Sequence, residues 1–136
     1  MMYKDRGFDM KKACVIGGSG FLGSHVCDQL SEAGYKVLVY DRTISPWIRE
    51  DQTMVVADIL DESALSQAIE GCEVVFNFAA IADLNEAFDR PIETVKVNIL
   101  GNAMVLEACR HHVVKRYVYA STVYVHSREG SFYRCS

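Results

Sequence analysis

The sequence lacks the features of a membrane protein, a secreted protein or a nucleic-acid-binding protein. None of its apolar runs approaches the roughly 20 residues that a membrane-spanning helix needs. Residues 1–12 contain no apolar core of the kind that a secretory signal has. The formal net charge of the 136 residues is −4, so there is no excess of positive charge to bind a phosphate backbone. We therefore expect a cytoplasmic protein with neither a membrane nor a nucleic acid as partner.

Paired cysteines are also missing. The five cysteines are odd in number and include no Cys-x-x-Cys pair. This pattern favours the reduced thiols of a cytosolic protein over a disulfide framework. His111 and His112 follow Cys109 closely, but adjacent residues of a helix point in different directions and make poor joint metal ligands. The sequence therefore predicts no metal site.

Short apolar runs alternate with helical patterns along the chain. The runs do not alternate with polar residues, which is typical of parallel strands covered on both faces. The predicted strands are Ala13–Ile16, Lys36–Tyr40, Met54–Ala57, Glu73–Phe78 and Arg116–Ala120. Strands that alternate with helices predict an α/β fold, here a doubly wound parallel sheet of about five strands. We expect one domain over residues 13–136, behind a flexible lead of residues 1–12.

The predicted helices carry start and stop signals. Asp61 is a candidate N-cap for a helix that Gly71 ends. A helical stretch of about 20 residues follows Pro91 and has apolar residues on one side, namely Val95, Ile99 and Leu106. Residues 42–53 have the weakest pattern, so we expect a loop there, at the carboxyl edge of the sheet.

A glycine-rich turn follows the first predicted strand. Gly18, Gly20 and Gly23 fit the spacing Gly-x-Gly-x-x-Gly of a dinucleotide-binding turn, and Gly17 adds a second register. In that turn the glycines allow a tight bend, a close approach to a pyrophosphate and tight helix–strand packing. The free N–H groups of the following helix then face the phosphates. The alternative, glycines that serve only a tight turn, is disfavoured by the strand before them and the helix after them.

Asp41 ends the second predicted strand and is the candidate ribose-binding acid. A carboxylate at that point accepts hydrogen bonds from the ribose hydroxyls and repels a 2′-phosphate, which favours NAD over NADP. Arg42 follows it directly, and an arginine there is able to pair with such a phosphate. The sequence therefore predicts NAD and leaves NADP as the alternative.

Three further strand ends carry candidate site residues. Asp58 and Ile59 follow the third strand, where the alternative is a polar strand end before a core isoleucine. Ala79 and Ala80 follow the fourth, where small residues leave room for a flat ligand but are also common in cores. After the fifth come Thr122 and, eleven residues later, Tyr133. A hydroxyl and a phenol at the carboxyl edge suit proton transfer coupled to hydride transfer, although such residues also occur in ordinary loops.

Together these residues resemble the extended short-chain dehydrogenase/reductase family, in its NAD-dependent sugar epimerase/dehydratase group. The resemblance covers residues 12–136 and implies a Rossmann-type domain. The segments that match the family's cofactor-binding motifs are Gly17, Gly18, Ser19, Gly20, Phe21, Leu22 and Gly23 in the turn, then Asp41, Asp58 with Ile59, Ala79 with Ala80, and Asn98 in the long helix. Tyr119–Thr122 matches the strand end that carries the catalytic hydroxyl, which implies that role for Thr122.

The resemblance implies a nucleotide-sugar epimerase-like oxidoreductase that transiently oxidises a sugar hydroxyl with bound NAD. The family's Tyr-x-x-x-Lys pair implies that Tyr133 is catalytic, and the lysine would follow Ser136. We therefore expect an NAD-binding portion that stops before the catalytic lysine and the substrate domain, and that is inactive in isolation. The alternatives are an NAD(P)-dependent reductase of the same fold and a non-catalytic nucleotide-binding fragment. Relatives often pair through the helix after Pro91, which implies a possible homodimer.

Overall fold

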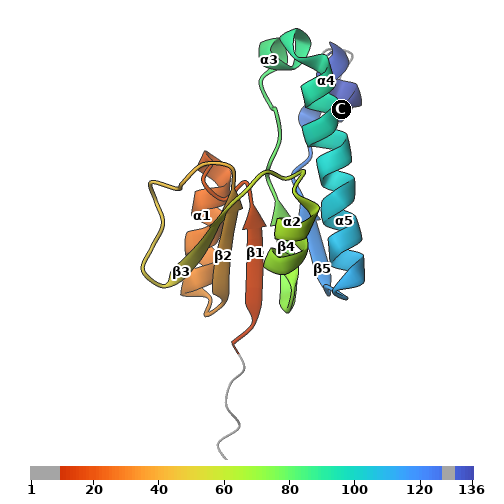
Figure 1. Ribbon diagram of the computed structural model, residues 1–136. Coiled ribbons are helices and arrows are strands. Elements are labelled where there is room, and N and C mark those ends of the chain that lie inside the picture. Colours follow the sequence, from red (N-terminus) through yellow and green to blue (C-terminus); the bar gives the residue numbers. More distant parts are fainter. Residues whose placement is uncertain (1–9, 127–130) are drawn as a thin grey trace, which may run out of the picture.

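A computed structural model describes residues 10–126 and 131–136 (Figure 1). The elements in chain order are β1 (Lys12–Ile16), α1 (Phe21–Glu32), β2 (Lys36–Asp41), β3 (Gln52–Val56), α2 (Glu62–Ile69), β4 (Cys72–Asn77), α3 (Leu84–Asp89), α4 (Pro91–Thr94), η1 (Val95–Gly101), α5 (Asn102–His111), β5 (Arg116–Tyr119), η2 (Val123–His126) and η3 (Ser131–Cys135). Each predicted strand is present, with ends shifted by one or two residues. Most of the predicted lead, residues 1–9, lies outside the described residues.

All strand pairs of the sheet are parallel, in the order β3-β2-β1-β4-β5. The chain therefore moves outward from β1 in one direction to β3 and then crosses back to β4 and β5. Parallel neighbours require crossover connections, and the helices supply them. This confirms the predicted α/β fold with a doubly wound parallel sheet.

The central strands are apolar because both of their faces are covered. Val15, Val37 and Val39 pack on the side of α1, against Cys27. Their neighbours in the strands face the other way, toward α2 and α5, in a larger cluster (Figure 1). Each such side chain is almost fully buried, and burial of one valine or leucine side chain stabilises a fold by roughly 1.5–3 kcal/mol.

The long helix predicted after Pro91 forms as α4, η1 and α5 in succession, but its buried side differs from the apolar pattern. The predicted apolar residues lie on the exposed side: Val95, Ile99 and Leu106 are 39%, 45% and 44% exposed. The buried side carries the polar residues Thr94 and Asn98, Gly101 and a single larger apolar residue, Val105. The turn of η1 is a π-helix, a form that inserts an extra residue and is frequent near functional sites.

Helix α3 was not expected from the sequence. Its N-cap Asp83 accepts hydrogen bonds from the N–H groups of Asn85 and Glu86, both at 2.9 Å. An N-cap acid followed three residues later by glutamate is a start signal for a helix.

The order of the strands reverses direction between β1 and β4. At such a switch point the crossovers leave on opposite faces, so a crevice opens at the carboxyl ends of the two strands. The glycine-rich turn follows β1 there, and the segment of Phe78–Ile81 follows β4. The topology therefore brings together segments that are about sixty residues apart in the chain.

Candidate functional site

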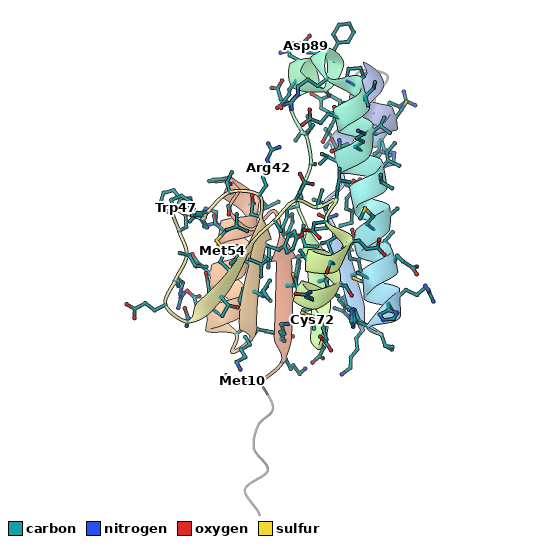
Figure 2. The ribbon with its side chains drawn as sticks, in the orientation of Figure 1. Met10, Arg42, Trp47, Met54, Cys72 and Asp89 are labelled. Carbon is teal, nitrogen blue, oxygen red and sulfur yellow. The ribbon has the colours of Figure 1, made fainter. Side chains whose placement is uncertain are left out.

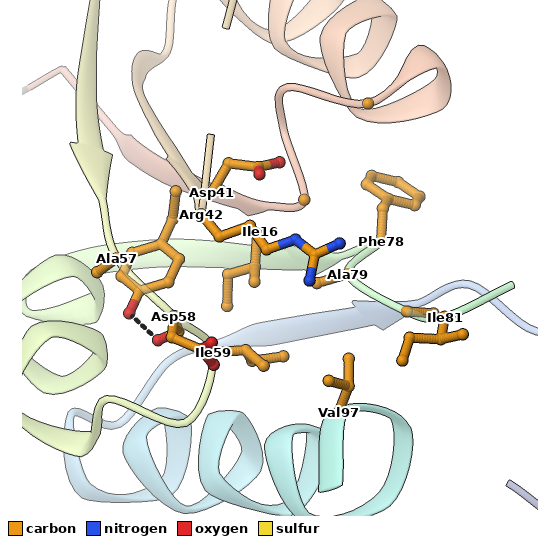
Figure 3. A pocket seen from close by; sticks show the side chains of 14 residues that line it. Ile16, Asp41, Arg42, Ala57, Asp58, Ile59, Phe78, Ala79, Ile81 and Val97 are labelled. Carbon is orange, nitrogen blue, oxygen red and sulfur yellow. Dashed lines mark hydrogen bonds between the residues drawn. The ribbon is translucent and has the colours of Figure 1, made fainter. Parts of the chain in front are cut away.

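A cavity of about 190 Å³ lies at the carboxyl edge of the sheet (Figure 3). Its walls come from the glycine turn, the ends of the neighbouring strands and η1. The lining residues are Ile16, Gly17, Gly20, Tyr40, Asp41, Arg42, Ala57, Asp58, Ile59, Phe78, Ala79, Ala80, Ile81 and Val97. Eight of the predicted cofactor-binding residues therefore border one cavity: Gly17, Gly20, Asp41, Arg42, Asp58, Ile59, Ala79 and Ala80.

The glycine turn has no space for side chains at its critical positions. Gly17 has φ +77°, and a Cβ there would lie 2.6 Å from the backbone nitrogen of Ala79. A Cβ on Gly23 would press against the carbonyl oxygen of Gly17 and lie 2.8 Å from Cα of Gly18. A Cβ on Gly18 would lie 2.8 Å from Cγ1 of Val39 in β2. Gly18 and Gly23 therefore serve the packing of the turn against the strands and α1, and both lie outside the lining of the cavity.

The turn leads into the N-terminus of α1, which fits a pyrophosphate. Gly20 is the N-cap, and no side chain caps the helix. The first N–H groups of a helix have no partner within it and carry a partial positive charge. Phe21 and Leu22 are the first two residues of α1, and their backbone N–H groups are among those that face outward from the start of the helix. The residues present fit the phosphates of a dinucleotide.

Asp41 holds the turn and faces the mouth of the cavity. Its Oδ2 accepts a hydrogen bond from the N–H of Ser19 at 3.0 Å, and its Oδ1 accepts from the N–H and the Oγ1 of Thr43 at 3.1 and 3.2 Å. Ser19 also donates from its Oγ to the carbonyl of Thr43 at 2.8 Å. The carboxylate is therefore held in place beside the cavity, where it meets a ribose in a dinucleotide-binding site.

Asp58 and Ile59 belong both to the core and to the cavity. Asp58 Oδ1 accepts from the N–H of Leu60 at 2.8 Å, and the Asp58 carbonyl accepts from the Tyr40 hydroxyl at 2.7 Å. Burial, followed by the charges of Asp61 and Asp58, raises the pKa of Tyr40, so this phenol stays a neutral donor. Ile59 is 7% exposed and lies against Gly101, where a Cβ would be 2.9 Å from its Cγ2. Asp58 and Ile59 therefore take part in the packing of the core and also border the cavity.

Two asparagines hold the backbone of the wall after β4. Asn77, which ends the strand, accepts from the N–H of Ala79 at 3.1 Å. Asn98 is buried and both accepts from the N–H of Ile81 at 2.8 Å and donates to its carbonyl at 3.1 Å. Asn98 therefore lies behind the cavity wall instead of lining it, and its neighbour Val97 is the residue of η1 that borders the cavity.

The two predicted catalytic residues lie beyond β5, away from this cavity. Thr122 precedes η2 and its Oγ1 accepts from the N–H of Tyr124 at 3.3 Å. The ring of Tyr124 meets the ring of Tyr133 in η3 edge-to-face, with 6.1 Å between centroids. Tyr124 thus contacts both residues. Ser136 connects this cluster to η1, since its Oγ accepts from Asn98 at 3.2 Å.

Sequence reasoning missed the apolar walls of the cavity. Ala57, Ile81 and Val97 line it and were not singled out. Ile81 lies two residues beyond the predicted alanines and follows no recognisable motif. Val97 lies in the π-helical η1, a form that no periodicity in the sequence indicates.

In residues 10–126 and 131–136, no group of three or more His, Cys, Asp or Glu side chains is arranged to hold a metal ion. Within the same ranges, no helix has the length and apolarity to span a membrane.

Comparison with known proteins identifies relatives of this chain. The model of the "NAD dependent epimerase/dehydratase family" matches residues 13–132. UDP-glucose 4-epimerase of Klebsiella pneumoniae is 30% identical over 127 residues, which are 85% of this chain and 91% of that sequence. The 2-alkyl-3-oxoalkanoate reductase of Stenotrophomonas maltophilia (strain K279a) is 36% identical over 115 residues, 82% of this chain and 33% of that one. The structure of UDP-glucose 4-epimerase from Brucella ovis in complex with NAD has a TM-score of 0.79 at 30% identity.

This chain matches only about a third of the length of its longer relatives. The Brucella structure is matched over 85% of this chain but 37% of its own length. The matched part is the one that the glycine turn and the cavity occupy. The cofactor prediction is confirmed, since the family is NAD-dependent and a similar structure contains NAD. Because the family model covers nearly the whole chain, the chain belongs to the NAD dependent epimerase/dehydratase family.

Proposed function

We propose that this chain binds NAD with its adenosine in the cavity and its pyrophosphate on the turn before α1. The observation that carries the proposal is the meeting of Asp41 and the glycine turn at one cavity: the carboxylate is held by Ser19, which itself belongs to the turn. Ribose hydroxyls suit the carboxylate, phosphates suit the free N–H groups of the helix, and a flat base suits the apolar walls.

A fluorescence titration tests this proposal. NADH is added to the chain, and we expect enhanced and blue-shifted NADH emission that ADP-ribose reverses by competition. ADP-ribose shares the adenosine and the pyrophosphate but lacks the nicotinamide, so its competition locates binding at the cavity and the turn. Absence of any NADH signal, with a chain that is folded by circular dichroism, would contradict the proposal.

For the whole enzyme we propose transient oxidation of a sugar hydroxyl, with Tyr133 and Thr122 as the catalytic residues. NAD, when bound, supplies the hydride acceptor. Tyr133 takes the proton of the hydroxyl, and the Thr122 hydroxyl hydrogen-bonds the same oxygen as its charge develops. Their common contact, Tyr124, supports the pairing. The similarity to UDP-glucose 4-epimerases supports a nucleotide-sugar as substrate and epimerisation as the outcome.

The second candidate is a one-way reductase, which the similarity to the Stenotrophomonas reductase favours. An epimerase returns the hydride to its substrate, whereas a reductase consumes reduced cofactor. The distinguishing measurement uses the full-length protein with a UDP-sugar and no added cofactor. Turnover with retained NAD supports the epimerase, and a requirement for stoichiometric NADPH or NADH supports the reductase. Cofactor binding without turnover in either assay supports a non-catalytic module.

We also propose a homodimer through the exposed side of the helices α3 to α5. Apolar side chains gather there and are open to solvent: Phe88, Ile92, Val95, Ile99, Leu100 and Leu106. A group of exposed apolar residues of this size marks an interaction surface. Light scattering after gel filtration tests the proposal with Ile99→Lys, which should shift the mass to that of a monomer. Ile44→Lys, an exposed position in the loop after β2, serves as control and should leave the mass unchanged.

We propose the cytoplasm as the location of the protein. The free thiols of its cysteines support this, because four of them are buried in the core and none is paired among the described residues. Cell fractionation of a tagged full-length protein tests it, and recovery in the membrane or the extracellular fraction would contradict it.

A further inference from the structure

The cavity has one cationic side chain at its mouth. Arg42 directly follows β2 and is among the lining residues (Figure 3). Its side chain is exposed and extends over the opening toward the segment after β4, as Figures 2 and 3 show. For the part of the chain that the structure describes, no hydrogen bond or ion pair involves its guanidinium. Arg49, Arg90 and Arg110, in contrast, each have a carboxylate partner.

The absence of an ion pair at Arg42 has a local cause. Two carboxylates border the same cavity, those of Asp41 and Asp58. Both point to backbone N–H groups: Asp41 to Ser19 and Thr43, and Asp58 to Leu60. The two carboxylates that border the cavity therefore already accept hydrogen bonds from backbone N–H groups. A cation held near two carboxylates but paired with neither is free to contact what enters the cavity.

The opposite wall of the cavity is apolar. Ile59, Ile81 and Val97 project into it from three different segments (Figure 3). The space thus has hydrocarbon on one side and a planar cation on the other. A flat heteroaromatic ring matches both, since hydrocarbon packs on one face of it and a guanidinium stacks on the other.

We propose that Arg42 stacks on the adenine ring of the bound dinucleotide and closes the cavity over it. This proposal rests on the proposed binding of NAD. It states that Arg42 contributes to the affinity of the site for the adenosine part of the cofactor. A different role for the same cation is to pair with a 2′-phosphate, as arginines near this strand end do in NADP-binding sites. Asp41 lies next to that position and repels such a phosphate, which favours stacking.

The test distinguishes the contribution of the planar guanidinium group to binding from the contribution of its positive charge. NADH and ADP-ribose are titrated against the unmodified chain, Arg42→Ala, Arg42→Lys and the control Arg110→Ala. Arg110 is an exposed arginine of α5 that pairs with Glu107, far from the cavity. Since Arg42 is exposed, its variants should fold, which circular dichroism checks.

We expect Arg42→Ala to weaken the binding of both NADH and ADP-ribose by roughly three- to tenfold, the range of a guanidinium–ring contact. Arg42→Lys should recover little of this loss, because lysine keeps the charge but not the plane. Arg110→Ala should bind as the unmodified chain does. Full recovery in Arg42→Lys, unchanged affinity in Arg42→Ala, or a preference of the unmodified chain for NADPH that Arg42→Ala removes would each overturn the stacking role. In these three cases NADH binding by the unmodified chain remains, whereas its absence refutes the proposed function as well.

Discussion

Alanine substitutions at three glycines should separate the packing of the turn from its contact with the cofactor. A Cβ on Gly23 meets only backbone atoms, the carbonyl oxygen of Gly17 and Cα of Gly18. Neither moves without displacing the turn. A Cβ on Gly20 has the Gly17 oxygen as its nearest neighbour at 3.4 Å, an ordinary contact. Gly34 follows the C-cap of α1, has φ +83° and has nothing within 4 Å of its Cβ position.

The expected magnitudes follow from these surroundings. Gly23→Ala is an overpacking change, which costs about 1–3 kcal/mol, or roughly 4–12 °C in melting temperature for a chain of this size. Gly34→Ala strains only the backbone, at a cost of roughly 1–2 kcal/mol. Gly20→Ala should change the free energy of unfolding by less than about 1 kcal/mol. Its methyl group, however, stands where the phosphates approach, so the dissociation constant for NADH should rise by roughly tenfold.

Thermal denaturation followed by circular dichroism and NADH fluorescence titration give the two readouts. Gly23→Ala should impair both, Gly34→Ala stability alone, and Gly20→Ala binding alone. The reasoning is refuted if Gly23→Ala is as stable as the unmodified chain, or if Gly20→Ala binds NADH with unchanged affinity.

Three further predictions concern the walls and the core. Asn98→Ala removes both hydrogen bonds to the backbone of Ile81 and should lower the free energy of unfolding, measured in urea, by about 2–4 kcal/mol. The control Asn85→Ala changes an exposed side chain and should cost less than about 0.5 kcal/mol. Equal losses in the two variants would contradict a supporting role of Asn98 for the backbone of Ile81. Asp41→Asn removes the charge that repels a 2′-phosphate, so the ratio of NADPH to NADH affinity should rise in paired titrations, and an unchanged ratio would argue against the ribose assignment. Burial raises the pKa of the Cys109 thiol from 9.0 to about 11, so the unfolded chain releases this proton first and stability should fall as pH rises from 9 to 11. Urea unfolding across that range checks the sign. Cys109→Ala should make the slope less steep, and the remainder comes from the other thiols whose pKa burial raises, Cys14, Cys27 and Cys72.

Several features were readable in the sequence because they depend on neighbours in the chain. The apolar runs predicted all five strands; for the central strands β1, β2 and β4 the reason is that a strand covered on both faces needs apolar residues at almost every position, whereas β3 and β5 are edge strands and are partly exposed. The glycine spacing predicted the turn, because backbone geometry and close packing exclude side chains there. The candidate N-cap Asp61 is confirmed, since its carboxylate accepts from the N–H of Ala64 at 3.0 Å.

The long helix shows where such reasoning fails. Its apolar residues Ile99 and Leu106 predicted a buried side, yet they are exposed, and Asn98 and Gly101 face the sheet. The reason is that the helix approaches Ile59 too closely for a larger residue than glycine, and that the backbone of Ile81 requires a side-chain amide. Both contacts are made with segments outside the helix, so the sequence of the helix alone does not reveal them.

The sequence by itself therefore determined the strands, the glycine turn and the acid at the end of β2, because each is a local consequence of backbone geometry, burial or capping. Only the tertiary structure decided which of these residues share a cavity and that Asn98 supports its wall while Val97 lines it. It also decided that Arg42 extends over the mouth of the cavity without an ion-pair partner among the residues that the structure describes. Those features depend on distances between segments far apart in the chain. Such distances follow from the strand order and the π-helical turn, and no pattern of neighbouring residues records them.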